Sequence, residues 1–187
     1  MTNLFNAQTA QEIKALLKNG ANVNNGIRGS YPLYIAVLKN DLKMFNILMA
    51  ANADVNIGFL TFYGHIIHYV CCTGYCDIFD RMVELNCDLE ITGFFDETPL
   101  ITACMSEQID IVDRLLALDC NVNAYDENGK SAFLHAVETG NLDILNKLIV
   151  YGANMTHIDN DGNNALYYAN LNGGQKIIDY ISSFNCF

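Results

Sequence analysis

An internal repeat constrains the fold of this 187-residue chain more than any other feature of its sequence. Similar turn segments recur at intervals of 32, 34, 33 and 33 residues, beginning at Ala21, Ala53, Cys87, Cys120 and Ala153. Self-similarity at this period is typical of proteins that stack copies of one supersecondary unit, each copy contacting only its neighbours. We therefore expect a stacked array of short units.

Each period predicts two short helices joined by a turn. In the fourth copy, Thr98 is placed to cap a helix, and Pro99 stands at the first helical position, where a missing N–H group costs nothing. A second helix is expected from about Asp110, because apolar residues follow it at helical spacing. We expect that helix to end near Asp119, where other copies carry glycine or asparagine, residues that tolerate left-handed backbone.

These copies resemble the ankyrin repeat, whose signature is close to D-x-x-G-x-T-P-L-H-x-A-A-x-x-G-x-x-x-I-V-x-x-L-L-x-x-G-A-D-V-N. Residues 53–56 carry the last four letters of that signature unchanged. The resemblance implies an all-α fold, an ankyrin-repeat solenoid of stacked helix-turn-helix units with finger-like loops. It also implies one domain over residues 1–187, with capping repeats at 1–24 and 157–187 and full repeats at 25–56, 57–90, 91–123 and 124–156.

Net charge argues against two classes of partner. The chain has 10 basic and 21 acidic residues, a formal charge of -11. Nucleic acids and anionic membranes attract clustered cations, so we expect neither as a partner. The N-terminal residues show no secretory signal, and the seven cysteines are odd in number and unevenly spaced. We expect a cytoplasmic protein, with the nucleus or delivery into a host cell as alternatives.

No sequence motif predicts catalysis or a cofactor. The chain contains no G-x-S-x-G, no phosphate-binding glycine loop and no H-E-x-x-H. His65, His68, Cys71, Cys72 and Cys76 are close enough in sequence to consider zinc. Their places in the repeat explain most of them as core residues, since free cysteine behaves as a small apolar residue. We expect no enzyme activity, no cofactor and no metal.

The resemblance implies that a partner contacts the loop tips and the ends of the first helices. An aromatic side chain has no structural role at a solvated tip, so tip aromatics are candidate anchors. Acids are interleaved with them, and such a surface suits a protein partner with a basic and partly apolar segment. The alternative is a solvated face that keeps the chain soluble. The candidate partner-binding residues are Arg28, Phe62, Phe94, Phe95, Asp96, Glu97, Met105, Tyr125, Asp126 and Glu127.

The acidic residues are concentrated in one stretch of the chain. Residues 77–127 carry 13 acids and two bases, whereas the acidic and basic residues on either side of this stretch are nearly equal in number. Some of these acids begin second helices, where negative charge favours the helix dipole. The sequence indicates no such local role for the five acids in the loops around the fourth repeat, which are Glu90, Asp96, Glu97, Asp126 and Glu127.

The resemblance also implies a modification site. Asparagine in the A-D-V-N turn can be a substrate of an asparaginyl hydroxylase that favours leucine eight residues earlier and an acid two residues earlier. Leu48 and Asp54 meet both preferences for Asn56. The alternative is that Asn56 only braces the loop.

We expect the main function to be non-enzymatic protein binding by a monomer, through the loop tips and concave face of repeats 2–4. A composition with 2 Pro and no Trp is compatible with an AT-rich coding genome. Ankyrin proteins encoded by such AT-rich genomes often engage host proteins. A host-directed effector or an inhibitor of a signalling protein is therefore an alternative function.

Overall fold

The described part of the chain is built from helices. In this computed structural model, those residues hold eleven α-helices and no strand, with isolated β-bridges at Gly58–His65 and Tyr125–Ser131. The all-α prediction is confirmed. No helix in these ranges is long and apolar enough to span a bilayer. The described residues are 4, 7, 9–26, 31–58, 64–171 and 174–184.

The chain divides into two compact units. Unit 1 comprises residues 1–70 and 75–88, and unit 2 comprises residues 71–74 and 89–187. The prediction of one domain over residues 1–187 stays a prediction. The helices are α1 (Ala10–Lys18), α2 (Pro32–Leu38), α3 (Leu42–Ala50), α4 (Ile66–Thr73), α5 (Cys76–Glu84), α6 (Pro99–Met105), α7 (Ile109–Ala117), α8 (Ala132–Thr139), α9 (Leu142–Val150), α10 (Ala165–Leu171) and α11 (Gln175–Ser182).

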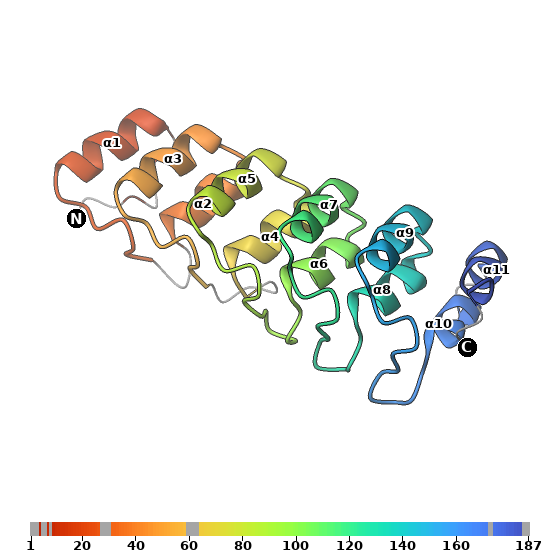
Figure 1. The fold of residues 1–187 in the computed structure, drawn as a ribbon. Helices are drawn as coiled ribbons and strands as arrows, with labels where there is room; N and C mark the ends of the chain where they lie inside the picture. Colours follow the sequence, from red (N-terminus) through yellow and green to blue (C-terminus); the bar gives the residue numbers. More distant parts are fainter. Residues whose placement is uncertain are drawn as a thin grey trace. The chain divides into compact units, whose positions relative to one another are not determined.

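Within each unit, short helices pack as neighbouring pairs (Figure 1). In unit 1, α3 packs against α1, α2 and α5. In unit 2, the pairs are α6 with α7, α8 with α9 and α10 with α11. Helices α6, α8 and α10 form one row, and α7 packs on α9 in a second row. The loops that precede α6, α8 and α10 project from the helix pairs.

The predicted helix boundaries are confirmed by the capping contacts. The Thr98 hydroxyl accepts a hydrogen bond from the N–H of the third residue of α6, and Pro99 occupies the first turn. Ser131 caps α8 in the same way. All five residues expected to end a helix in left-handed backbone have a positive φ, between 57° and 84°. They are Gly20, Asn52, Asn86, Asp119 and Gly152.

The core of unit 2 comes from the apolar faces of the two helix rows. Ile111, Val112 and Leu115 on α7 are fully buried, as their helical spacing predicts, and Phe133 on α8 is buried in the row of first helices. Complete burial of one such side chain stabilises a fold by about 1.5–3 kcal/mol. Because each short helix is held by its neighbours, the stack supports the projecting loops.

A side chain from the turn of one repeat bonds to the backbone of the next. In unit 2, Asn123 Oδ1 accepts from the Asn154 N–H at 2.7 Å, and Glu90 Oε1 accepts from the Asn121 N–H at 2.7 Å. Glu90 stands where the signature has asparagine, and its carboxylate takes over the bracing contact. The expectation that Glu90 has no local role is therefore wrong.

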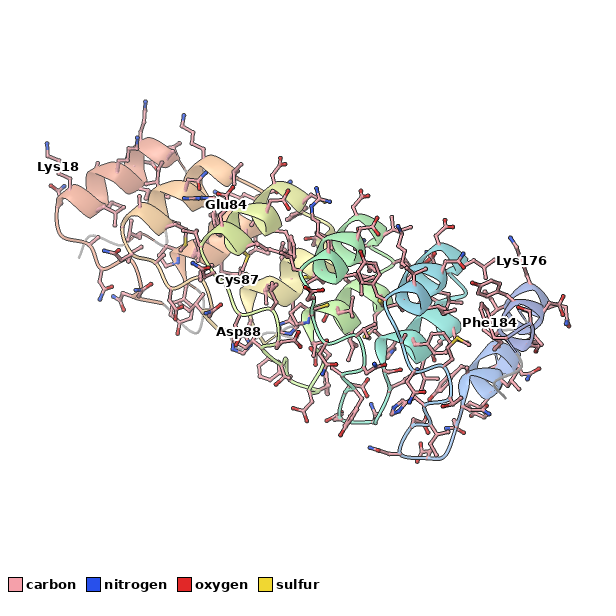
Figure 2. The ribbon with its side chains drawn as sticks, viewed as in Figure 1. Lys18, Glu84, Cys87, Asp88, Lys176 and Phe184 are labelled. Carbon is pink, nitrogen blue, oxygen red and sulfur yellow. The ribbon has the colours of Figure 1, made fainter. Side chains whose placement is uncertain are left out.

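Unit 1 shows the same contact at its last turn. The Asn56 Oδ1 atom accepts from the Asp88 N–H at 2.9 Å. Asp88 lies with Cys87 on the segment that leaves α5, and Glu84 lies on the last turn of that helix (Figure 2). The bracing role considered for Asn56 is thus observed, and its hydroxylation stays a prediction.

Candidate functional site

Unit 2 presents three equivalent hairpin loops, which we call finger 1 (residues 91–97), finger 2 (124–130) and finger 3 (157–163). Each finger is closed by one backbone hydrogen bond at the same place. The N–H groups of Gly93, Asp126 and Asp159 donate to the carbonyl oxygens four residues later, at 2.9, 3.1 and 3.0 Å. Gly93, Asp126 and Asp159 are therefore equivalent positions, and the fingers can be compared residue by residue.

In finger 2, the Asp126 carboxylate holds the loop together. Its Oδ1 atom accepts from the N–H groups of Asn128 and Lys130, each at 2.9 Å, and its Oδ2 atom lies 2.9 Å from His135 Nε2 on α8. Asp126 is only 8% exposed. The prediction of Asp126 as an accessible acid with no local role is wrong, because burial and these bonds commit the carboxylate to the finger.

Finger 3 repeats this arrangement. The Asp159 Oδ1 atom accepts from the N–H groups of Asp161 and Asn163, at 3.0 and 2.8 Å, and the Tyr168 hydroxyl donates to Oδ2. Tyr168 on α10 is equivalent to His135 on α8. Asp159 was not among the predicted site residues. The D-x-x-G part of the repeat signature, matched at residues 126–129 and 159–162, was the signal that identifies both aspartates.

Finger 1 has the carboxylate on the opposite arm. Glycine replaces aspartate at position 93, and the Glu97 Oε2 atom accepts from the Phe95 N–H at 2.8 Å. A Cβ atom added to Gly93 would lie 2.1 Å from Glu97 Oε1, so the glutamate occupies the space that the aspartate side chain takes elsewhere. Glu97 is 8% exposed, and its predicted role as an accessible contact acid is wrong for the same reason as for Asp126.

The first helix behind finger 1 shows a consequence of this exchange. Thr102 is equivalent to His135 and Tyr168, which both bond to the aspartate of their own finger. The Thr102 Oγ1 atom is buried and has no hydrogen-bond partner among the described residues. Because position 93 carries no side chain, the acceptor that the other two helices use is absent from finger 1.

The electrostatics of the two aspartates follow from these contacts. Burial alone raises the pKa of each carboxyl group. The hydrogen bonds from His135 and backbone N–H groups outweigh burial for Asp126, and those from Tyr168 and Asn163 outweigh it for Asp159. Both pKa values therefore lie below the ordinary value, so both carboxylates are ionised at neutral pH.

Acid is expected to destabilise unit 2 through these two groups. Their folded pKa values lie below the unfolded value of about 3.9. The resulting stability is present above that value and is lost as the pH falls through it toward the folded pKa values. The free energy of unfolding, measured with urea from pH 7 to pH 3, should fall more steeply for the natural chain than for the double variant Asp126→Asn, Asp159→Asn. Equal slopes would contradict this assignment.

The residues left exposed at the fingers are mostly aromatic or acidic. Phe94 and Phe95 are each 53% exposed and Tyr125 is 61% exposed, with Asp96 and Glu127 also on the surface. The Tyr125 ring stacks on His157, with ring centroids 5.9 Å apart. Neighbouring fingers are joined by backbone bonds, since the Glu127 N–H donates to Phe95 O at 2.8 Å and the Asn160 N–H donates to Asn128 O at 3.0 Å.

The remaining predicted site residues are Met105, Arg28 and Phe62. Met105, at the end of α6, is exposed. Arg28 and Phe62 lie outside the described residues. The exposed residues Ile158 and Asp161 of finger 3 were missed, because no candidate partner-binding residue was expected beyond Glu127.

The five histidines and cysteines considered for zinc differ in burial, and His65, Cys72 and Cys76 are only half-buried. His68 and Cys71 are fully buried. Among the described residues, no group of three or more potential ligands is close enough to hold a metal ion. Elsewhere in the stack, burial raises the pKa of the Cys87 thiol to about 11 and that of Cys120 to about 12, which keeps both thiols protonated at neutral pH.

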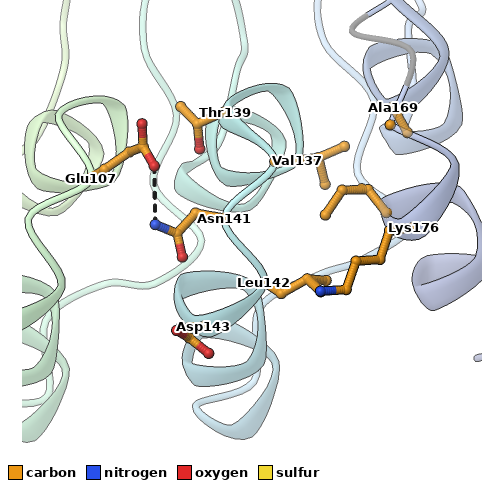
Figure 3. Close-up of a pocket in the computed structure, with 11 residues that line it drawn as sticks. Glu107, Val137, Thr139, Asn141, Leu142, Asp143, Ala169 and Lys176 are labelled. Atoms are coloured by element: carbon orange, nitrogen blue, oxygen red, sulfur yellow. Dashed lines mark hydrogen bonds between the residues drawn. The ribbon is translucent and has the colours of Figure 1, made fainter.

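A hollow of about 590 Å³ lies in unit 2 at the turns between paired helices (Figure 3). The Glu107 Oε2 atom accepts from Asn141 Nδ2 at 3.1 Å, and Asp143 and Lys176 add charged groups to the wall. None of the predicted site residues lines this hollow. The fingers therefore remain the candidate site.

Comparison with protein families agrees with the repeat. A family model described as "Ankyrin repeats (3 copies)" matches residues 67–159 and 118–186. A second, described as "Ankyrin repeat", matches residues 28–58. Comparison with curated proteins gave no match.

Proposed function

The chain belongs to the ankyrin repeat family, whose domains are generally protein-binding modules and typically non-catalytic, and we propose that it binds a protein partner through its fingers. The proposed contact surface lies in unit 2 and excludes the buried carboxylates of Glu97 and Asp126. It consists of Phe94, Phe95, Asp96, Met105, Tyr125 and Glu127.

The observation that carries this proposal is the exposure of two adjacent phenylalanines at the tip of finger 1. Phe94 and Phe95 are both about half exposed, although the Glu97 carboxylate and the bond from Gly93 to Glu97 hold the tip in place. Buried aromatic anchors surrounded by polar residues dominate the affinity of protein interfaces. A preorganised tip also loses little conformational entropy on binding, which favours affinity.

The charge around these anchors supports a basic partner. Asp96 and Glu127 are exposed, and neither carboxylate forms an ion pair with a described residue. They belong to the stretch of 77–127 that carries 13 acids and two bases. Such a field increases the association rate of a positively charged partner and decreases it for an acidic one.

Replacing both anchors should abolish tight binding. We expect the variant Phe94→Ser, Phe95→Ser to bind a partner identified by affinity capture about 100-fold more weakly, because loss of an interface anchor costs about 2 kcal/mol or more. The measurement is titration calorimetry with the full chain. Glu97 is left unchanged because it braces the finger.

The matched control is the variant Val150→Ser, Tyr151→Ser, which removes two exposed apolar residues at the end of α9. It should bind the partner as the natural chain does. If the control loses as much affinity as the finger variant, or if the finger variant loses none, the fingers are not the binding surface.

A further inference from the structure

A second hollow lies in unit 1, where α1 and α3 pack together. It has a volume of about 720 Å³, and the described residues that line it belong to these two helices. Its apolar lining comes from Leu42, Ile47 and Ala50, of which Leu42 and Ile47 are half-buried. Lys14 on α1 and Lys43 on α3 also line it, and both are exposed. The hollow therefore combines apolar surface with two cations.

Elsewhere in this row of helices, polar side chains join one helix to the next. In unit 1, Arg81 Nε on α5 donates to Asn46 Oδ1 on α3 at 2.8 Å. In unit 2, Lys147 Nζ on α9 lies 2.6 Å from Asp113 Oδ1 on α7. Each contact joins the fifth residue of one helix to the sixth residue of the next helix in the row.

The pair α1 and α3 cannot form this contact. Its equivalent residues are Lys14 and Ile47, and isoleucine has no polar atom that could bond to the lysine. Lys43, the second residue of α3, differs from the later repeats too, because the second residue of α5, α7 and α9 is aspartate. Neither lysine forms an ion pair with a described residue. These three differences make the hollow more apolar and more basic than the same place in the later repeats.

We propose that this hollow binds a short segment of a protein partner that carries both acidic and apolar side chains. Apolar side chains of the segment cover Leu42 and Ile47, and its carboxylates pair with Lys14 and Lys43. Charge complementarity favours such a segment. This surface shares no residue with the fingers, and its partner segment has a charge opposite to the one proposed for them.

The acids of the same two helices do not oppose such a segment. The only acid within α1 or α3 is Glu12, and Asp41 directly precedes α3. The Glu12 carboxylate accepts from the Thr9 N–H at 3.3 Å, and the Asp41 carboxylate accepts from the Met44 N–H at 2.8 Å. Both carboxylates thus cap the starts of their helices, and neither residue lines the hollow.

The hollow suits a peptide segment rather than a membrane surface. A protein that lies on a bilayer buries apolar side chains in the lipid. Leu42 and Ile47 are already half-buried and line a recess, so they are covered only by side chains that enter it. A peptide segment supplies such side chains and leaves its charged groups at the polar rim, beside the exposed lysines.

Three labelled twelve-residue peptides test this chemistry against the full chain by fluorescence anisotropy. The first repeats Glu-Leu-Asp-Phe three times. The second repeats Gln-Leu-Asn-Phe, which has no charged side chain, and the third repeats Glu-Ser-Asp-Ser, which has no apolar one. We expect the first peptide to bind about tenfold more tightly than either of the others, because it alone pairs with the lysines and covers the apolar lining.

The double variant Lys14→Asn, Ile47→Arg tests the hollow at constant net charge. It gives α1 and α3 the same pair of residues that joins α3 to α5, so the helices should stay packed. Because this pair crosses the apolar lining, we expect the first peptide to bind about tenfold more weakly. Circular dichroism checks that the helix content and the unfolding midpoint are those of the natural chain.

The variant Lys14→Gln, Lys43→Gln tests the charge. It should also bind the first peptide about tenfold more weakly, and the remaining affinity should depend little on salt. The matched control is Lys18→Gln, Lys176→Gln, which removes two exposed lysines that do not line this hollow (Figure 2). The control should bind the first peptide as the natural chain does.

The inference is wrong if the first two peptides bind equally, if no peptide binds, if either hollow variant keeps its affinity, or if the lysine control loses as much. Displacement of the first peptide by vesicles of phosphatidylserine and phosphatidylcholine would assign the hollow to a membrane instead. The variant Phe94→Ser, Phe95→Ser should bind the first peptide normally, and loss of binding there would also contradict the inference. None of these results bears on the proposed function, which is tested with the captured partner.

Discussion

Asp126→Ala is expected to lower the free energy of unfolding by about 3 kcal/mol, because the change leaves buried hydrogen-bond donors without an acceptor. In the natural chain the carboxylate accepts from the N–H groups of Asn128 and Lys130 and lies within hydrogen-bond distance of His135. These donors belong to the finger and to α8, so both the loop and its attachment to the stack are weakened. Urea denaturation followed by far-ultraviolet circular dichroism measures the loss.

A graded series distinguishes these bonds from general effects of charge. Asp126→Asn keeps an oxygen acceptor and should lose about half as much stability as the alanine variant. Glu127→Ala removes an equal charge from the neighbouring exposed residue and should change stability by less than about 0.5 kcal/mol. If Glu127→Ala is as destabilising as Asp126→Ala, the buried carboxylate does not hold the finger.

Gly93→Asp is the second substitution with a large expected effect, a loss of about 2–3 kcal/mol, although it restores the aspartate of the repeat signature. The new side chain needs the space that the Glu97 carboxylate fills, since a Cβ atom there lies 2.1 Å from Glu97 Oε1. Glu97 would have to leave the Phe95 N–H, and two carboxylates would stand together in a largely buried place.

A second change should rescue this variant. The pair Gly93→Asp, Glu97→Asn reproduces the residues that finger 3 has at Asp159 and Asn163, where the asparagine Nδ2 atom donates to the aspartate at 3.0 Å. We expect the free energy of unfolding of the double variant to lie within about 1 kcal/mol of that of the natural chain. A double-mutant cycle measures this coupling between the two positions. Additive effects of the two changes would show that the positions do not compensate for each other.

Much of the fold was predictable because its determinants are local and recur. The caps at Thr98 and Ser131 depend on residues within one turn of helix, and the left-handed residues at helix ends depend on their own side chains. Because the turn occurs in five copies, the helix end assigned in each copy could be checked against the same position in the others. The period of the apolar residues that follow Asp110 likewise identified the buried face of α7.

The candidate site was predictable only in part. Exposure of Phe94, Phe95 and Tyr125 was expected, since aromatic residues at a tight loop tip have little protein to pack against. The sequence could not show which acids are buried and which are exposed, because Asp126 and Glu127 are adjacent and chemically alike. Only the hydrogen bonds show that Asp126 faces His135 and that Glu127 faces solvent.

The sequence by itself determined the repeat, the helix pairs and the family, because spacing and local capping are properties of residues near one another along the chain. The tertiary structure alone decided which acids are structural and which are available to a partner. That difference depends on contacts across a folded loop, such as Glu97 filling the place of a side chain that Gly93 lacks. Residues four positions apart on opposite arms become neighbours only when the finger closes, and burial then fixes their roles.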